Sequence, residues 1–353
     1  MKKSLIALAV LAASGVASAQ STVTLYGLLD GYLGSVKEKI TVNGTSSSLR
    51  QTVINSGGFN TSRFGMRGSE DLGGGLKANF VLESGFGLDT GAASSYTNPF
   101  TGAVSTSVFS RQSWVGASGA FGEVKLGKMW TPFDDVKGLG AAAFDSNLFA
   151  PAANVWLSNN YSDRPGNAIY YATPDFSGFS AAAMYSLGEN KTPAAKAGKI
   201  VSANVKYAAG PAAVALSHQE EKVNGNAVTT KFTQLNGSWD FGVAKLLGAY
   251  GQVKNFSATL AGVTANVDKS REYQLGVDVP VGPALTLSGG VARSKITLAA
   301  AGGEVKSTGF GLAAKYELSK RTFLYTGLQL SKNKLASDEV KNDTYAVGLQ
   351  HKF

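Results

Sequence analysis

Apolar and polar residues alternate along extended segments throughout this chain, and the last ten residues show the pattern most clearly. One face of that segment is apolar and the other is small or polar: Tyr345, Val347, Leu349 and Phe353 stand opposite Thr344, Ala346, Gly348, Gln350 and Lys352. A period of two predicts a strand whose faces meet two different environments. Taken alone, the segment fits either an ordinary amphipathic edge strand or a strand between lipid and a wet lumen.

Sixteen segments of this kind are predicted, separated in turn by short and long connections. The first seven are expected at 22–35, 59–68, 76–88, 108–117, 123–130, 165–173 and 179–188, with polar connections at 36–58 and 131–163. Later short turns at 209–211, 240–242, 280–283 and 318–321 alternate with polar tips near 189–198, 220–228, 255–269, 299–304 and 336–341. An even strand count places both termini on one side, as bacterial barrels require.

The expected fold is therefore all-β, a 16-stranded antiparallel transmembrane β-barrel. The expected strands are near the length that crosses a bilayer on a tilt, and their inner faces carry charged and amide side chains. Such groups would be costly in a dry protein core, whereas a water-filled lumen removes that cost. The alternation of connections predicts that the termini and short turns are periplasmic and the long loops extracellular.

Composition removes several kinds of site. The chain has no cysteine and two histidines, His218 and His351, so disulfides, thiolate chemistry and a histidine-rich metal site are not expected. We therefore expect no metal and no cofactor. The net charge is +9, but the lysines are dispersed, so a nucleic-acid partner is not expected either.

The N-terminus has the pattern of a secretory signal peptide. Lys2 and Lys3 precede an apolar stretch from Leu5 to Val16, and Ala19 ends a small-x-small cleavage pattern. We predict a signal peptide at residues 1–19 and the barrel at residues 20–353. Its removal would lower the net charge from +9 to +7, because two lysines leave with it.

Several motifs resemble the general porins of Gram-negative outer membranes. The chain is similar to that family at Ser21–Gly27, Ser62–Lys77, Ser110–Gly116 and Phe121–Lys128, and at the terminal Phe353. The resemblance implies a homotrimer of barrels in the outer membrane, in contact with lipid and lipopolysaccharide. It also implies that the third extracellular loop folds inward and that Phe353 is an assembly signal for the barrel-assembly machinery.

The resemblance further implies a constriction in which loop acids face a ladder of basic wall residues. Arg63 and Arg111 follow a serine and are expected on the face opposite Phe64 and Trp114; the other candidates are Arg67, Arg164 and Lys77 on the basic side, and Asp134, Asp135, Asp145 and Glu83 on the acidic side. Glu83 is also a candidate for holding an arginine in place. The loop departs from the family pattern at Gly138–Phe144, which leaves the choice among the three aspartates open.

The expected function is passive diffusion of ions and small hydrophilic solutes through the outer membrane. An unequal distribution of charge along the lumen sets ion preference, and the positive balance predicts a weak preference for anions. An adhesin or structural barrel is the alternative. A barrel enzyme is a weaker one, because neither His218 nor His351 stands in a recognisable triad pattern.

Overall fold

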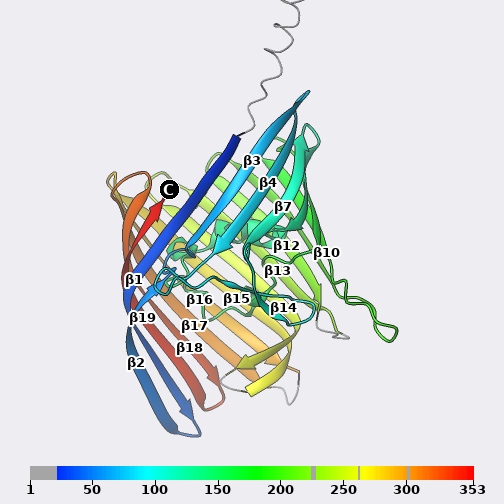
Figure 1. Cartoon of the computed structure of the whole chain (residues 1–353). Helices are drawn as coiled ribbons and strands as arrows, with labels where there is room; N and C mark the ends of the chain where they lie inside the picture. Colours follow the sequence, from blue (N-terminus) through cyan, green and yellow to red (C-terminus); the bar gives the residue numbers. More distant parts are fainter. Residues whose placement is uncertain (1–21, 224–227, 261–262, 300–302) are drawn as a thin grey trace, which may run out of the picture.

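The computed structural model describes residues 22–223, 228–260, 263–299 and 303–353. Within these ranges no helix is long and apolar enough to cross a membrane. The predicted signal peptide at residues 1–19 lies outside the described residues. Strands are the main secondary structure of the described chain, and they form one large sheet and a separate two-stranded hairpin (Figure 1).

Seventeen strands make up the large sheet, and every pairing in it is antiparallel. Their bounds are β1 (Thr22–Val42), β2 (Thr45–Ser56), β3 (Arg63–Gly73), β4 (Leu76–Gly85), β7 (Gln112–Gly119), β8 (Gly122–Lys128), β9 (Ala168–Ala172), β10 (Phe179–Leu187), β11 (Lys199–Ala209), β12 (Ala212–Lys222), β13 (Thr230–Asp240), β14 (Lys245–Leu260), β15 (Val263–Val281), β16 (Leu285–Leu298), β17 (Glu304–Glu317), β18 (Thr322–Leu335) and β19 (Asp338–Lys352). Strands β2 and β3 pair with successive parts of β1 and so form one interrupted wall strand. The barrel therefore has sixteen strands, as predicted.

The first and last strands close the barrel. β1 pairs with β19 from Leu28 opposite Lys352 to Thr41 opposite Glu339. Beyond that ladder, Gly27 and Phe353 exchange backbone hydrogen bonds of 3.1 and 3.0 Å. The final segment therefore pairs with the first strand and closes the ring.

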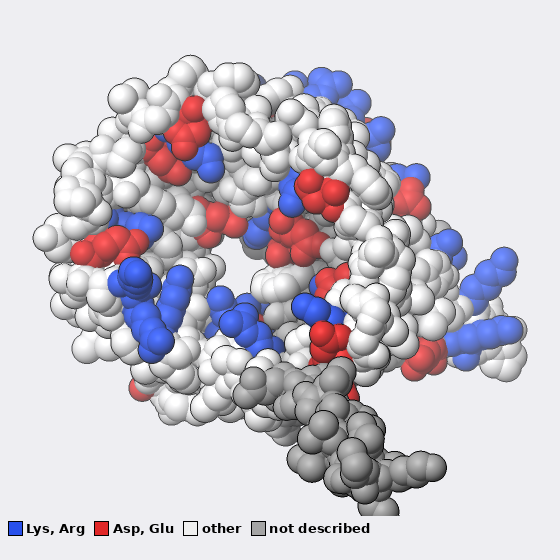
Figure 2. All heavy atoms as spheres, turned by 90° about the horizontal axis from the view of Figure 1, so that it is seen from above, with Lys and Arg blue, Asp and Glu red and all other residues white. Residues whose placement is uncertain are grey.

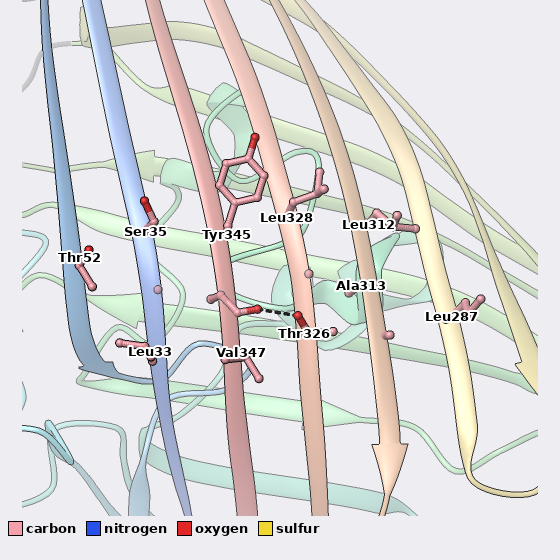
Figure 3. A pocket seen from close by; sticks show the side chains of 14 residues that line it. Leu33, Ser35, Thr52, Leu287, Leu312, Ala313, Thr326, Leu328, Tyr345 and Val347 are labelled. Carbon is pink, nitrogen blue, oxygen red and sulfur yellow. Dashed lines mark hydrogen bonds between the residues drawn. The ribbon is translucent and has the colours of Figure 1, made fainter.

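The two faces of the wall differ as the alternation predicted. In β19, Val347 is 51% exposed, whereas Gln350 is 1% exposed. Figure 3 shows part of the outer face, where leucine and valine side chains from β1 and β16–β19 line a shallow groove and the Thr326 hydroxyl donates to the Ala346 carbonyl at 3.0 Å. An apolar exterior over a polar interior is stable in a bilayer and unfavourable in water.

Three of the predicted polar connections are wrong, because strands continue through them. β1 runs to Val42 and β2 returns from Thr45, so most of 36–58 is a hairpin; likewise β14 and β15 continue through most of 255–269, and β19 begins at Asp338, within 336–341. Asn43 and Gly44 have φ of 50° and 80°, and positive φ at both central residues defines a type I′ turn. The first hairpin was missed because its serine-rich and threonine-rich strand lacks apolar alternation, although its backbone ladder is complete.

Strand β7 begins at Gln112 rather than at residue 108, and β9 begins at Ala168 rather than at residue 165. The connection between β4 and β7 contains the two-stranded hairpin β5 (Ser95–Thr97) and β6 (Val104–Thr106). These differences are small shifts of boundary and leave the order of the strands unchanged.

The connection between β8 and β9, residues 129–167, is the third long one and is here called the third connection. It contains α2 (Pro132–Lys137) and the short 3-10 turns η1 (Gly138–Gly140), η2 (Ala143–Asp145) and η3 (Leu157–Asn160). Thr131 caps α2, since its hydroxyl accepts a hydrogen bond from the Asp134 amide at 3.3 Å. These helical turns lie within the outline of the barrel (Figure 1).

Apolar packing and hydrogen bonds fix the third connection to the inner wall. Phe133 packs in a cluster with Phe232 of β13. The Phe133 amide donates to the Ser202 hydroxyl of β11 at 3.0 Å. On β17, a Cβ added to Gly309 would lie 2.0 Å from the Pro151 carbonyl oxygen, so glycine permits this close approach. This path agrees with the prediction of an inward-folded loop.

Candidate functional site

Four cations gather where several wall strands meet the third connection. Arg63 begins β3, Arg111 directly precedes β7, Lys128 ends β8 and Arg164 lies just before β9. These residues are called the basic cluster. Adjacent strands bring them together, because β3 pairs with β4, β4 with β7, and β7 with β8.

Glu83 of β4 is the carboxylate at the centre of the basic cluster. Its Oε1 accepts from Arg111 Nε at 2.8 Å, and its Oε2 lies 3.6 Å from Arg63 Nε. Tyr26 donates its hydroxyl to Oε2 at 3.0 Å. The side chains of Glu83 and Arg111 are 5% and 7% exposed, so water screens this ion pair little. The structure thus places Glu83 between two predicted arginines.

Aromatic rings support the other side of the cluster. The Arg164 guanidinium lies 4.1 Å from the centre of the Trp130 ring, and that of Arg111 lies 5.4 Å from it. The Lys128 ammonium lies 3.8 Å from the centre of the Tyr96 ring. Such cation–π contacts stabilise a cation without neutralising its charge.

Carboxylates compensate the basic cluster only in part. Glu83 and Asp163 form ion pairs within it, the latter with Arg164 at 3.0 Å. Burial is the main cause of the lowered pKa of Arg164, and Arg111 acts in the same direction while Asp163 opposes it. The cluster therefore carries an excess of positive charge. Figure 2, a view from the end with the chain termini, shows an opening through the barrel with charged side chains of both signs around it.

The three candidate loop aspartates lie in the third connection, and their contacts are with other groups. Asp134 accepts a hydrogen bond from the Tyr161 hydroxyl, and its Oδ1 lies 3.9 Å from Lys137 Nζ. Burial raises the pKa of Asp134 to about 6, against the opposing effects of Lys137 and Tyr161. Asp135 accepts from the Tyr170 hydroxyl at 2.8 Å. Across the described part of the chain, none of these aspartates forms an ion pair with the basic cluster.

Asp145 is exposed and sits in an unusual backbone turn. Ala143, Phe144 and Asp145 have φ of 51°, 63° and 50°, a left-handed conformation that costs free energy for residues with a side chain. The buried Phe149 cluster includes Ala143 and supports this turn. Packing therefore fixes the position of Asp145, although no ion pair to it is found within the described ranges.

Arg67 and Lys77 lie apart from the basic cluster, nearer the short turn between β3 and β4. Arg67 is exposed and lies 5.3 Å from the centre of the Tyr26 ring. Lys77 is opposite Ser118 in the β4–β7 ladder. The structure brings together Arg63, Arg111 and Arg164 but leaves these two cations as a separate group.

The expected position of Trp114 is wrong. Trp114 packs against the Lys125 ammonium at 4.9 Å, on the face that also holds Tyr170, and its neighbour Val115 is 58% exposed on the outer face. Trp114 therefore lies on the inner side, as Arg111 does. Counting by twos failed because Arg111 precedes the first residue of β7, so strand alternation does not extend back to it.

Sequence reasoning also missed Lys128 and two wall carboxylates that anchor the third connection. Glu272 of β15 accepts from the Leu157 amide at 2.7 Å and from Ser158, and Glu221 of β12 accepts from the Ser162 amide at 2.7 Å. Both carboxylates are buried. The one signal available in the sequence was that both carboxylates alternate onto the inner face of the wall, because a buried acid in a strand needs a hydrogen-bond donor.

The described residues contain no grouping of three or more metal-ligating side chains. His218 pairs with Thr233 and His351 with Thr322, each at 2.8 Å. Neither histidine is placed as the base of a catalytic triad by these contacts.

Comparison with known proteins gives consistent results over nearly the whole length. The family described as Gram-negative porin matches residues 5–336. Outer membrane porin protein 32 of Delftia acidovorans is 37% identical, over 99% of this chain and 95% of that protein. An outer membrane porin protein of Bordetella pertussis is 30% identical over the full length of both chains.

Solved structures resemble the barrel as well. The anion-selective porin from Comamonas acidovorans superposes with a TM-score of 0.73 at 29% identity, covering 95% of this chain and all of that one. OmpT, an outer membrane protein of Vibrio cholerae, gives a TM-score of 0.67 at 16% identity, which is a likeness of fold alone.

Proposed function

We propose that this chain, which belongs to the Gram-negative porin family and is a passive diffusion channel of the outer membrane, selects weakly for anions at the basic cluster. The observation that carries the proposal is the charge balance, in which the three arginines alone outnumber the two carboxylates Glu83 and Asp163. The anion-selective relative from Comamonas acidovorans supports the same direction.

The charge acts where solutes pass it closely. Fixed cations beside a narrow aqueous path raise the local concentration of anions, because the protein around the path has a low dielectric constant and screens the charges little. Arg63 is the most accessible of the three arginines in the cluster, since its side chain is 26% exposed. We infer that Arg63 meets permeating ions, while Arg111 contributes charge from a buried position.

The test is the reversal potential of the refolded protein in a planar bilayer under a KCl gradient. The wild type should give a potential of the sign expected for weak anion preference. Arg63→Ser should reduce that preference while the barrel stays folded. Arg67→Ser is the matched control, because it removes the same charge outside the cluster and should have a smaller effect. A clear cation preference of the wild type would overturn the proposal.

Three finer properties belong to the same proposal. We infer that residues 1–19 are a cleaved signal peptide, that three barrels associate, and that Phe353 is read by the barrel-assembly machinery. Backbone pairing of Phe353 with Gly27 at the closing seam supports the last point. A native gel before and after heating tests the trimer, and a single band of monomer size in the unheated sample would argue against it.

A further inference from the structure

A polar cavity of about 200 Å³ lies between the third connection and the inner wall. The third connection contributes Lys137, Asp145 and Trp156 to its lining. Three neighbouring strands form its other side, with Gln234 and Asn236 of β13, Ala249 of β14 and Gln274 of β15. We call this space the loop cavity. Strands β9 to β12 separate β8 from β13, so the loop cavity is distinct from the basic cluster.

Two buried polar atoms in the lining of the loop cavity have no partner. Trp156 and Gln274 are 5% and 4% exposed. Among the described residues, neither the indole Nε1 of Trp156 nor the amide Oε1 of Gln274 has a hydrogen-bond partner. The Nε2 of Gln274 donates to the Gly140 carbonyl at 2.9 Å, which fixes the amide and leaves its oxygen as an acceptor. Because an unpaired buried polar group costs free energy, this lining suits a polar occupant that both accepts and donates hydrogen bonds.

The same lining carries one charge of each sign, and these charges are not paired with each other. Lys137 forms one ion pair in the described part of the chain, a long one of 3.9 Å with Asp134. Asp145 lies against the residue that follows Lys137, since a Cβ added to Gly138 would be 3.8 Å from Asp145 Oδ2. Asp145 and Asn147 are exposed lining residues, so water and small solutes reach the cavity from this side.

We propose that the loop cavity binds small zwitterionic amino acids that enter the channel. A carboxylate matches the Lys137 ammonium and the Trp156 N–H, and an ammonium matches the Asp145 carboxylate and the Gln274 amide oxygen. The volume exceeds what a single water needs. Short side chains form most of the apolar lining, which leaves room for a small aliphatic group: Ala141, Ala150, Ala152, Ala153 and Ala249.

The first test compares ligands on the wild-type protein, folded in detergent micelles with isotope-labelled tryptophan. The chain has four tryptophans, and the indole N–H signal of Trp156 is identified as the one that Trp156→Phe removes. L-Alanine should shift this signal and saturate. Propionate lacks the ammonium and L-alaninamide lacks the carboxylate, so each should bind about tenfold more weakly. Equal binding of propionate or alaninamide would overturn the proposal, and so would a Trp156 signal without a saturable shift, which would mean that the cavity holds water only.

The second test removes the two charges of the loop cavity together. Lys137→Gln/Asp145→Asn leaves the net charge of the protein unchanged, and its affinity for L-alanine should fall about tenfold. The matched control is Lys125→Gln/Glu123→Gln, an ion pair of 2.8 Å on β8 that lies outside the cavity. The control should bind L-alanine as the wild type does, and equal affinity of the cavity variant would contradict the proposal. Heat-modifiable gel mobility verifies that both variants are folded, and the ligand comparison on the wild type decides the question if one is not.

This inference rests on the proposed channel function, which brings the amino acid to the cavity, but it does not rest on the preference for anions. Reversal potentials of the wild type in KCl without amino acid test that preference separately. A channel that conducts and prefers anions, yet shows no saturable shift of Trp156 with L-alanine, would refute the binding site alone.

Discussion

The geometry and burial of the ion pair between Glu83 and Arg111 allow us to predict how much a substitution there lowers the free energy of unfolding. Replacing Glu83 by Gln keeps an oxygen that can accept from Arg111 but leaves the arginine charge uncompensated. The two charged groups are 2.8 Å apart and almost fully buried. Coulomb's law at an effective dielectric constant of about 20 gives an attraction of about 6 kcal/mol. Loss of one partner of a buried pair costs about 3–5 kcal/mol in practice, and we expect the lower part of that range.

A second pair on the inner wall provides a matched control. Lys125 and Glu123 are also 2.8 Å apart, but their side chains are 19% and 31% exposed. Water weakens such a pair, so Glu123→Gln should cost only about 0.2–1 kcal/mol. Urea titration of the folded barrel in phospholipid vesicles, followed by heat-modifiable gel mobility, measures both losses. If Glu83→Gln destabilises the barrel no more than Glu123→Gln does, the reasoning from burial is refuted.

The double variant Glu83→Gln/Arg111→Gln distinguishes the cost of an uncompensated buried charge from the cost of a lost hydrogen bond. Removing both charges together leaves no uncompensated charge at the buried Arg111 position, although the more exposed Arg63 still loses its carboxylate partner, so the double variant should be more stable than Glu83→Gln alone. Selectivity should follow the charge: Glu83→Gln should increase anion preference, Arg111→Gln should reduce it, and the double variant should return near the wild type. A double variant as unstable as the sum of the two single ones would show that the groups act independently.

Three further predictions address the third connection and the closing seam. Gly309→Ala should push the Pro151 carbonyl away from β17, since an added Cβ would be 2.0 Å from the carbonyl oxygen, and the single-channel conductance should change. Gly248→Ala is the control: the nearest atom to its added Cβ would be 3.6 Å away, so the conductance should stay unaltered. Asp134 has a pKa of about 6, raised by burial, so its charge is lost as pH falls from about 7.5 to about 5. Anion preference measured by reversal potential should therefore rise over that interval, and Asp134→Asn should make the change smaller. Deletion of Phe353 should lower the yield of folded barrel in the outer membrane more than it changes the conductance of the barrels that do form, and equal yields would argue against its role in assembly.

The strands that cross the bilayer could be predicted because each is in contact with two solvents. Val347 and Gln350 differ in exposure as their positions in the alternation require. Where both faces of a hairpin meet water, as at Val42 and Thr45, the sequence shows no alternation of apolar and polar residues that would mark the strands. The hairpin there depends on backbone pairing and on the turn at Asn43, neither of which follows from hydrophobicity.

The candidate site could be predicted only where it stays in regular register. Arg63 and Glu83 lie within strands, and their inward direction follows from counting by twos. Arg111 lies before its strand, and Lys128 follows Gly127, whose φ of 132° interrupts the alternation. The same count therefore placed Trp114 on the wrong face and gave no reason to select Lys128.

The acidic side of the site depends on the path of the third connection, and that path is determined by wall residues distant in sequence. Glu272 accepts hydrogen bonds from the backbone amides of Leu157 and Ser158, and Gly309 permits the close approach of Pro151. The path of the loop is therefore set by a buried carboxylate and a glycine on separate barrel strands. These two residues face the same loop only when the strands have paired in their native register. The wall sequence and the loop sequence must therefore change together if the constriction is to keep its shape, and a loop aspartate cannot be assigned to a basic partner from the loop alone.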